Sequence, residues 1–146
     1  MSAKRPVTRS YERGFTLIEI MVVVVIIGLL AAIVAPNLIG NIDRAAVTRA
    51  KGDLRSIETA LNLYRLDNFR YPSTDEGLRA LVTSPGDAVA PNWKQYLRSV
   101  PVDPWKNEYQ YLYPGRQGEF DVFSYGADGQ EGGEDIDADI GNWNLD

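Results

Sequence analysis

Residues 14–35 read GFTLIEIMVVVVIIGLLAAIVA, and this stretch decides the fold. From Ile20 to Ala35 it holds 16 consecutive residues without a polar side chain. A helix needs roughly 20 apolar residues to cross a bilayer, and the run that starts at Phe15 is long enough if Glu19 is accommodated. We therefore predict a transmembrane helix over residues 15–38.

Charge is distributed unevenly along the 146-residue chain, whose net charge is −5. Residues 1–14 hold four basic side chains and one acidic side chain, whereas residues 117–146 hold nine acidic side chains and no basic one. Because positively charged flanks stay on the cytoplasmic side of a membrane, we expect residues 1–14 in the cytoplasm and the body of the chain outside. The acidic body argues against nucleic-acid binding.

The sequence contains no cysteine and no histidine. This composition excludes a disulfide framework, a thiolate nucleophile and the usual catalytic triads. An enzyme that uses paired carboxylates, such as Asp103 and Glu108, remains an alternative, although nothing in the sequence fixes these two side chains in a cleft. We expect a protein that is not an enzyme.

A basic leader before an apolar run is also typical of a secretory signal peptide, for which Ala31, Ala32 and Ala35 offer a cleavage region. The run is long for that role, and an amphipathic pattern continues after it. Glu19 lies inside the run, and an acid within a membrane segment suggests a function. The alternative is that Glu19 lies at the membrane interface and is solvated by lipid headgroups.

Beyond the apolar run, apolar residues recur at steps of three and four, close to the helical period of 3.6. They are Ile39, Ile42, Ala46, Ala50, Leu54, Ile57, Leu61 and Tyr64. We expect one long helix over residues 15–66 with one packed face. Because Pro36 removes a helical hydrogen bond, we expect a kink or a locally melted stretch within residues 28–40, and a plain helix break is the alternative.

The remaining residues, 39–146, are predicted to form a globular domain. Ser73 to Glu76 reads as a capping box for a short helix near residues 74–82, and Asn92 is a candidate cap for a second short helix that carries Trp93, Tyr96 and Leu97.

Alternating patterns predict two strands at residues 108–113 and 119–125, joined by a turn. Tyr109, Tyr111 and Tyr113 would then share one face of the first strand. We expect this face to pack on the long helix, and an exposed aromatic platform is the alternative. The fold class is therefore α+β, with a small antiparallel sheet and short helices.

The segment from Gly14 to Glu19, after a basic leader and before an apolar run, resembles the processing signal of type IV pilins and pseudopilins. The resemblance implies that a prepilin peptidase cleaves between Gly14 and Phe15 and then N-methylates Phe15. Residues 1–14 would be removed, and residues 15–38 would stay as the polymerisation helix. The resemblance also implies that Glu19 serves assembly by pairing with the Phe15 ammonium of a neighbouring subunit.

The rest of the sequence resembles the major pseudopilins of the bacterial type II secretion system, although Lys106 stands where a glycine usually follows the tryptophan. The segments that carry the resemblance are YPSTDEGL (71–78), PVDPW (101–105), NEYQY (107–111), SYGADG (124–129) and DIGNW (139–143). It implies a type IV pilin-like fold and a structural subunit of the bacterial inner membrane with a periplasmic body. The alternative is a type IV or DNA-uptake pilin, against which the missing cysteine pair argues.

The same resemblance implies partners. The subunit would polymerise with itself into a periplasmic fibre, together with minor pseudopilins, on an inner-membrane assembly platform. The fibre would drive the export of folded proteins across the outer membrane.

Residues 125–141 concentrate carboxylates and glycines, and hard oxygen ligands on a flexible loop suit Ca²⁺. The loop is not an EF-hand, because Ile140 stands where that motif needs glycine. The alternative is a solvated acidic loop. The pseudopilin resemblance implies one bound Ca²⁺ with carboxylates of Asp128 and Asp139 and backbone carbonyls of Tyr125 and Gln130, completed by Asp135 or Asp137.

Overall fold

The computed structural model describes residues 14–146, without the side chains of residues 34–39 and 41. All but the last residue of the predicted basic leader therefore lies outside the described residues. The chain divides into two compact units, residues 1–39 and residues 40–146. Each unit is considered by itself.

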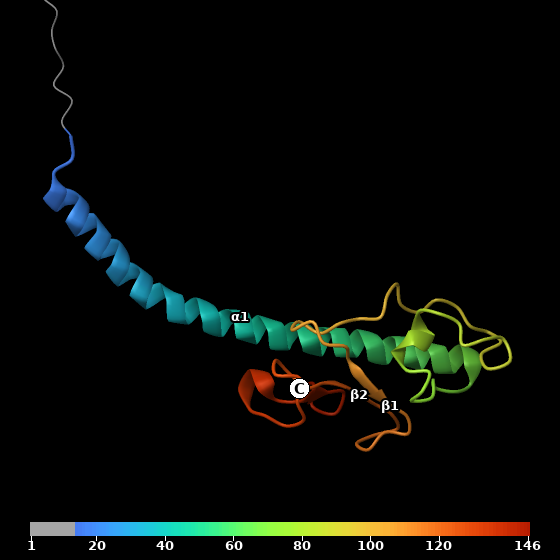
Figure 1. Cartoon of the computed structure of the whole chain (residues 1–146). Coiled ribbons are helices and arrows are strands. Elements are labelled where there is room, and N and C mark those ends of the chain that lie inside the picture. Colours follow the sequence, from blue (N-terminus) through green and yellow to red (C-terminus); the bar gives the residue numbers. More distant parts are fainter. Residues whose placement is uncertain (1–13) are drawn as a thin grey trace, which may run out of the picture. The chain divides into compact units, whose positions relative to one another are not determined.

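Helix α1 spans Leu17–Asn68 and has 52 residues (Figure 1). Its helical backbone continues through residues 28–40, so the locally melted stretch and the plain break considered at Pro36 are both wrong. A proline removes one hydrogen bond of the ladder, and the helical backbone continues on both sides of it. A kink at Pro36 stays a prediction.

The core of unit 2 lies along one face of α1. Of the predicted stripe, Ala50, Leu54, Ile57, Leu61 and Tyr64 are at most 1% exposed. The prediction is wrong for Ile42, which is 67% exposed, and Ala46 is only half-buried. The buried side chains of the stripe belong to one cluster that also includes residues of the sheet and of the 78–90 segment. Because every buried residue of the described chain lies at or after Ala50, residues 40–146 hold their own core, and we expect them to fold by themselves.

A three-stranded antiparallel sheet packs beside the second half of α1 (Figure 1). Its strands are β1 (Gln110–Leu112), β2 (Asp121–Ser124) and β3 (Ile140–Gly141), and β2 lies in the middle. β1 and β2 fall inside the predicted strands but are shorter. β3 was not predicted, because two residues are too few to show an alternating pattern.

The three tyrosines of the first hairpin strand face the core, as predicted. Tyr109 and Tyr111 are buried, and Tyr113 is half-buried against the core cluster. The Tyr109 hydroxyl donates to Asp53 Oδ2 on α1 at 3.2 Å. Burial, and then the Asp53 carboxylate, raise the pKa of Tyr109 well above its usual range. The tyrosines therefore join the sheet to α1.

Ser73 and Glu76 form the predicted capping box, since the Ser73 amide donates to Glu76 Oε2 at 2.6 Å and the Glu76 amide donates to Ser73 Oγ at 3.2 Å. The element that follows is a turn and a short 3₁₀ helix, η1 (Leu78–Leu81). This helix is shorter than the predicted one.

The helix predicted after Asn92 is wrong, because residues 92–97 are not helical. The Asn92 backbone amide donates instead to Asn68 Oδ1 at 3.2 Å, and the Asn92 side-chain amide donates to the Asp67 carbonyl at 3.0 Å. Asn92 therefore fastens this loop to the end of α1 and caps no new helix.

Two buried carboxylates organise the irregular backbone around the sheet. Asp103 is 2% exposed and accepts the amides of Trp105 and Asn107, at 3.0 and 2.8 Å, together with the Ser124 hydroxyl at 2.6 Å. Asp121, equally buried, accepts the three successive backbone amides of residues 116–118. Each carboxylate thus satisfies donors that no strand partner serves.

Replacing Asp103 tests this role. Asp103→Ala leaves two backbone amides and one hydroxyl unpaired at a buried position, and it should destabilise residues 40–146 by about 3 kcal/mol. Asp103→Asn keeps a side-chain carbonyl acceptor and should lose clearly less. Urea unfolding of the two variants measures the difference, and an Asp103→Ala domain as stable as the parent would contradict the assignment.

Candidate functional site

The N-terminal processing segment lies at the start of α1. Gly14, Phe15 and Thr16 precede the helix in non-helical conformation. Beyond Gly14 and its two neighbours in the chain, no atom lies within 4 Å of the position that a Cβ at Gly14 would occupy. The peptide bond between Gly14 and Phe15 is therefore outside the helical hydrogen-bond ladder and sterically open.

Glu19 belongs to the first turn of α1 and forms a capping box with Thr16. Glu19 Oε2 accepts the Thr16 amide at 2.7 Å and the Thr16 hydroxyl at 2.9 Å, while the Glu19 amide donates to Thr16 Oγ1 at 3.3 Å. The residues Thr-x-x-Glu are the signature of this motif, which was not predicted for Thr16 and Glu19. In the single subunit, the Glu19 carboxylate already has donors.

The side chains that follow Glu19 have no cover within the subunit. Every described side chain from Gly14 to Ile33 is exposed, including the large apolar ones. Across the described residues, no helix combines the length and the hydropathy of a membrane span. A helix that is apolar on all faces is stable only where another apolar surface covers it.

The acidic loop between β2 and β3 folds back on itself. The Ala127 amide donates to the Ile136 carbonyl at 2.9 Å, beside the 3₁₀ turn η2 (Asp135–Asp137). Gly126 has φ +70°, and a Cβ there would lie 2.6 Å from the Asp137 backbone. Only glycine fits at this crossing, since both the conformation and the contact exclude a side chain.

Two of the carboxylates predicted to bind calcium, those of Asp139 and Asp128, accept amides of the loop backbone. Both oxygens of Asp139 accept the Gly132 amide at 3.1 Å, and Asp128 Oδ1 accepts the Gln130 amide at 3.0 Å. Tyr125 and Asp137 are half-buried, whereas Asp128, Gln130 and Asp135 are exposed. The structure therefore joins Asp139 to the middle of the loop but records no direct contact between Asp139 and Asp128.

The loop carboxylates are not neutralised by cations. Within residues 14–146 the ion pairs are Arg49–Asp53, Arg65–Glu119, Arg70–Glu76 and Lys94–Asp67, and none uses a carboxylate of residues 126–139. In the same part of the chain, no three acidic side chains lie close enough to hold a metal ion by themselves. A cation here would also need backbone carbonyls, as the predicted ligand set has.

The segment after the loop was not recognised as part of the site. Asn144 Oδ1 accepts the Gly141 amide at 2.8 Å, and Asn144 Nδ2 donates to the Asp139 carbonyl at 3.1 Å. Asn142 bridges to β2 through the Val122 amide and the Phe120 carbonyl. The sequence signal for these contacts is the pair of asparagines, Asn142 and Asn144, that lies close after Asp139.

The enzymatic alternative finds no support in the positions of its two carboxylates. Asp103 is buried and its carboxylate accepts hydrogen bonds from Trp105, Asn107 and Ser124, while Glu108 is exposed. A pair of catalytic carboxylates would have to face the same cleft.

Comparison with known protein families places both halves of the chain. The family model described as Type II secretion system (T2SS), protein G, matches residues 37–143. A model of the prokaryotic N-terminal methylation motif matches residues 9–35. The two matches adjoin and together span most of the sequence.

Individual relatives agree with these families. The type II secretion system core protein G of Pseudomonas aeruginosa is 59% identical over 138 residues, which cover 92% of this chain and 97% of that protein. The protein of the same description from Vibrio cholerae is 54% identical over 136 residues, covering 92% and 93%.

A solved structure shares the fold. The crystal structure of the major pseudopilin from the type 2 secretion system of enterohaemorrhagic Escherichia coli matches with a TM-score of 0.63 and 47% identity, over 74% of this chain and 95% of that chain. The predicted α+β, pilin-like fold is thereby confirmed. The chain belongs to the type II secretion system protein G family, the major pseudopilins.

Proposed function

We propose that the chain is made as a precursor, cleaved by a prepilin peptidase between Gly14 and Phe15, methylated on Phe15, and polymerised into a periplasmic pseudopilus that drives protein export. The observation that carries this proposal is the helix whose apolar side chains are all exposed from Phe15 to Ile33. The methylation-motif match supports the processing steps, as does the open, non-helical peptide at Gly14.

The exposed helix would be covered first by the inner membrane and then by the same helix of other subunits. By the positive-inside rule, the basic leader would keep residues 1–14 in the cytoplasm, and the body would then be periplasmic. Assembly would engage an inner-membrane platform and minor pseudopilins. The type IV and DNA-uptake pilin alternative has no supporting match among the relatives above.

Glu19 would pair with the Phe15 ammonium of the next subunit during assembly. A buried ammonium and a buried carboxylate are each unfavourable alone, and pairing them offsets part of that penalty. In the single subunit, Thr16 occupies the Glu19 carboxylate. Assembly would add the ammonium to this capped carboxylate or replace the Thr16 contacts, and either change fixes the register between two helices.

The acidic loop would bind one Ca²⁺ through Asp128, Asp139 and the carbonyls of Tyr125 and Gln130, with Asp135 or Asp137 completing the set. The donor chemistry fits, since all these groups offer hard oxygen atoms and each carboxylate keeps acceptor capacity beyond its backbone bond. The absence of ion-pair partners for the loop among residues 14–146 supports a cation as the missing counter-charge.

Processing is tested at Gly14. Gly14→Arg places a long charged side chain at the peptide bond that the peptidase must approach closely, and the variant should accumulate as the full-length precursor. Gly14→Ala is the matched small substitution and should be processed at least in part. Mass spectrometry of membrane fractions reads the outcome, and a mature, methylated Phe15 terminus in Gly14→Arg would refute the assignment.

Two substitutions separate the two roles of Glu19. Glu19→Gln keeps an acceptor for the Thr16 capping box but has no charge, whereas Glu19→Leu removes both. If charge pairing drives assembly, both variants should be cleaved normally and both should lose most fibres by electron microscopy. Wild-type amounts of fibre from Glu19→Gln would show that the capping box, and not the charge, is what assembly requires.

Calcium is tested on residues 40–146. At a hundredfold excess over Kd, Ca²⁺ should stabilise the folded domain by about 2.7 kcal/mol and raise its Tm by roughly 10 °C relative to chelator. Mg²⁺ should substitute poorly, because it demands a tighter octahedral arrangement.

Asp128→Ala and Asp139→Ala should each remove most of the calcium-dependent shift. Asp87→Ala removes an exposed acid outside the loop and should leave the shift intact. Equal Tm values in calcium and in chelator for the parent domain would mean that the loop is only solvated.

A further inference from the structure

Phe69, the residue that ends α1, is an aromatic residue in an unfavourable backbone conformation. Phe69 follows the last helical residue with φ +59°, and its amide donates to the Arg65 carbonyl at 2.7 Å. This is the left-handed cap that commonly ends helices, and glycine or asparagine is the usual residue there, because a Cβ strains the conformation. Phe69 therefore occupies a site for which local energetics favour other residues.

The Phe69 side chain is also largely uncovered by its own subunit. It is 88% exposed, and the neighbouring Leu66 is 71% exposed. Phe69 takes part in none of the aromatic ring pairs found within residues 14–146. Strain and exposure of a large apolar side chain are both unfavourable in the free subunit, so a contact outside the subunit explains the residue.

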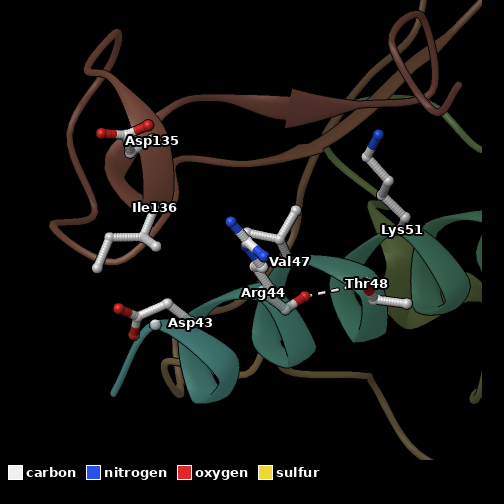
Figure 2. Close-up of a pocket in the computed structure, with 8 residues that line it drawn as sticks. Asp43, Arg44, Val47, Thr48, Lys51, Asp135 and Ile136 are labelled. Carbon is white, nitrogen blue, oxygen red and sulfur yellow. Dashed lines mark hydrogen bonds between the residues drawn. The ribbon is translucent and has the colours of Figure 1, made fainter. Parts of the chain in front are cut away.

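A groove of suitable chemistry lies at the other end of the soluble part of α1 (Figure 2). It has a volume of about 730 Å³ and lies between the helix and the acidic loop. Val47 of the helix and Ile136 of the loop supply apolar surface, and Arg44 adds a cation that favours the face of an aromatic ring. The Lys51 ammonium already donates to the Asp146 carbonyl at 2.7 Å, and Asp43 and Asp135 also line the groove. The Arg44 side chain is in none of the ion pairs of the described residues.

The two surfaces are separated along one helix. Val47 and Phe69 are 22 positions apart, which corresponds to about 33 Å at 1.5 Å per residue. A contact between two different surfaces of identical subunits is heterologous, and a displacement along the axis prevents closure into a ring. Repetition of such a contact builds a filament.

We propose that Phe69 and Leu66 of one subunit insert into the Val47–Ile136 groove of a second copy, displaced by about 33 Å along α1. The proposal rests on the homopolymeric fibre of the proposed function, and it names the contact that joins the globular parts of successive subunits along the fibre axis. The groove supplies what Phe69 lacks in the free subunit, namely apolar contacts and the Arg44 guanidinium against its ring.

Cysteine cross-linking tests the contact directly, because the chain has no cysteine of its own. The full-length Phe69→Cys, Thr48→Cys double variant places one thiol in each surface, with both positions exposed. Mild oxidation of sheared fibres should give a ladder of covalent multimers. The two single variants mixed in one cell should give dimers only, since each copy then has one reactive surface.

A matched control pairs Val89→Cys, an exposed apolar position outside both surfaces, with Thr48→Cys, and it should give no ladder. Fibres that form normally without a ladder from the Phe69 and Thr48 pair would overturn the proposal while leaving the proposed function intact. Failure of the parent chain to form fibres would instead count against the proposed function. A cross-link from the Phe69→Cys chain to a different membrane protein, without a ladder, would assign the surface to another occupant.

Phe69→Asn supplies an independent test, because the Tm of the domain and the yield of fibres should not fall together. Asparagine tolerates the left-handed conformation, so the Tm of residues 40–146 should be unchanged or higher by a few degrees. Fibre yield from the full-length variant should fall at least tenfold. A purely structural role for Phe69 would instead lower the Tm, and wild-type fibre yield would remove the basis of the proposal.

Discussion

The packing of one apolar face of α1 against the rest of unit 2 is the interaction on which the structure depends. Leu54, Ile57, Leu61 and Tyr64 are at most 1% exposed, and the tyrosines of the first hairpin strand meet them from the sheet. Without this face, strands of two to four residues would not be stable. The sheet, the loops and both 3₁₀ turns are therefore held in place by the buried face of α1. Among the described residues, the apolar first half of α1 contributes no buried side chain to this core.

Much of the backbone around the sheet is hydrogen-bonded to side chains and not to neighbouring strands. Buried Asp103 and Asp121 accept amide donors from the turns next to the sheet. Asn142 accepts the Val122 amide of β2 and donates to the Phe120 carbonyl just before this strand. A small domain can keep its regular structure minimal when such acceptors replace strand partners. The acidic loop follows this rule in part, because its Asp128 and Asp139 carboxylates accept backbone amides.

The long helix and its buried face could be predicted from sequence because a spacing of three and four repeated over several turns is a strong signal. The Ser73 capping box was equally readable, since both partners lie within four residues. The third strand and the role of Asn92 were not readable, because both depend on partners far away in the chain. At the site, the processing motif could be predicted because it is local, whereas the capping box of Thr16 and Glu19 was not predicted. The left-handed conformation and the exposure of Phe69 have no signal in the sequence.

The way the sheet is attached to α1 has a mechanical consequence. The sheet and α1 are joined by side-chain packing and by isolated hydrogen bonds such as that from Tyr109 to Asp53. The helix itself is stabilised along its length by its own backbone hydrogen bonds. Tension along the helix would load the buried stripe in shear, so that all its contacts resist together. Force on the β1–β2 hairpin, directed away from the helix, would peel the same contacts one after another and would detach the sheet at a much lower load.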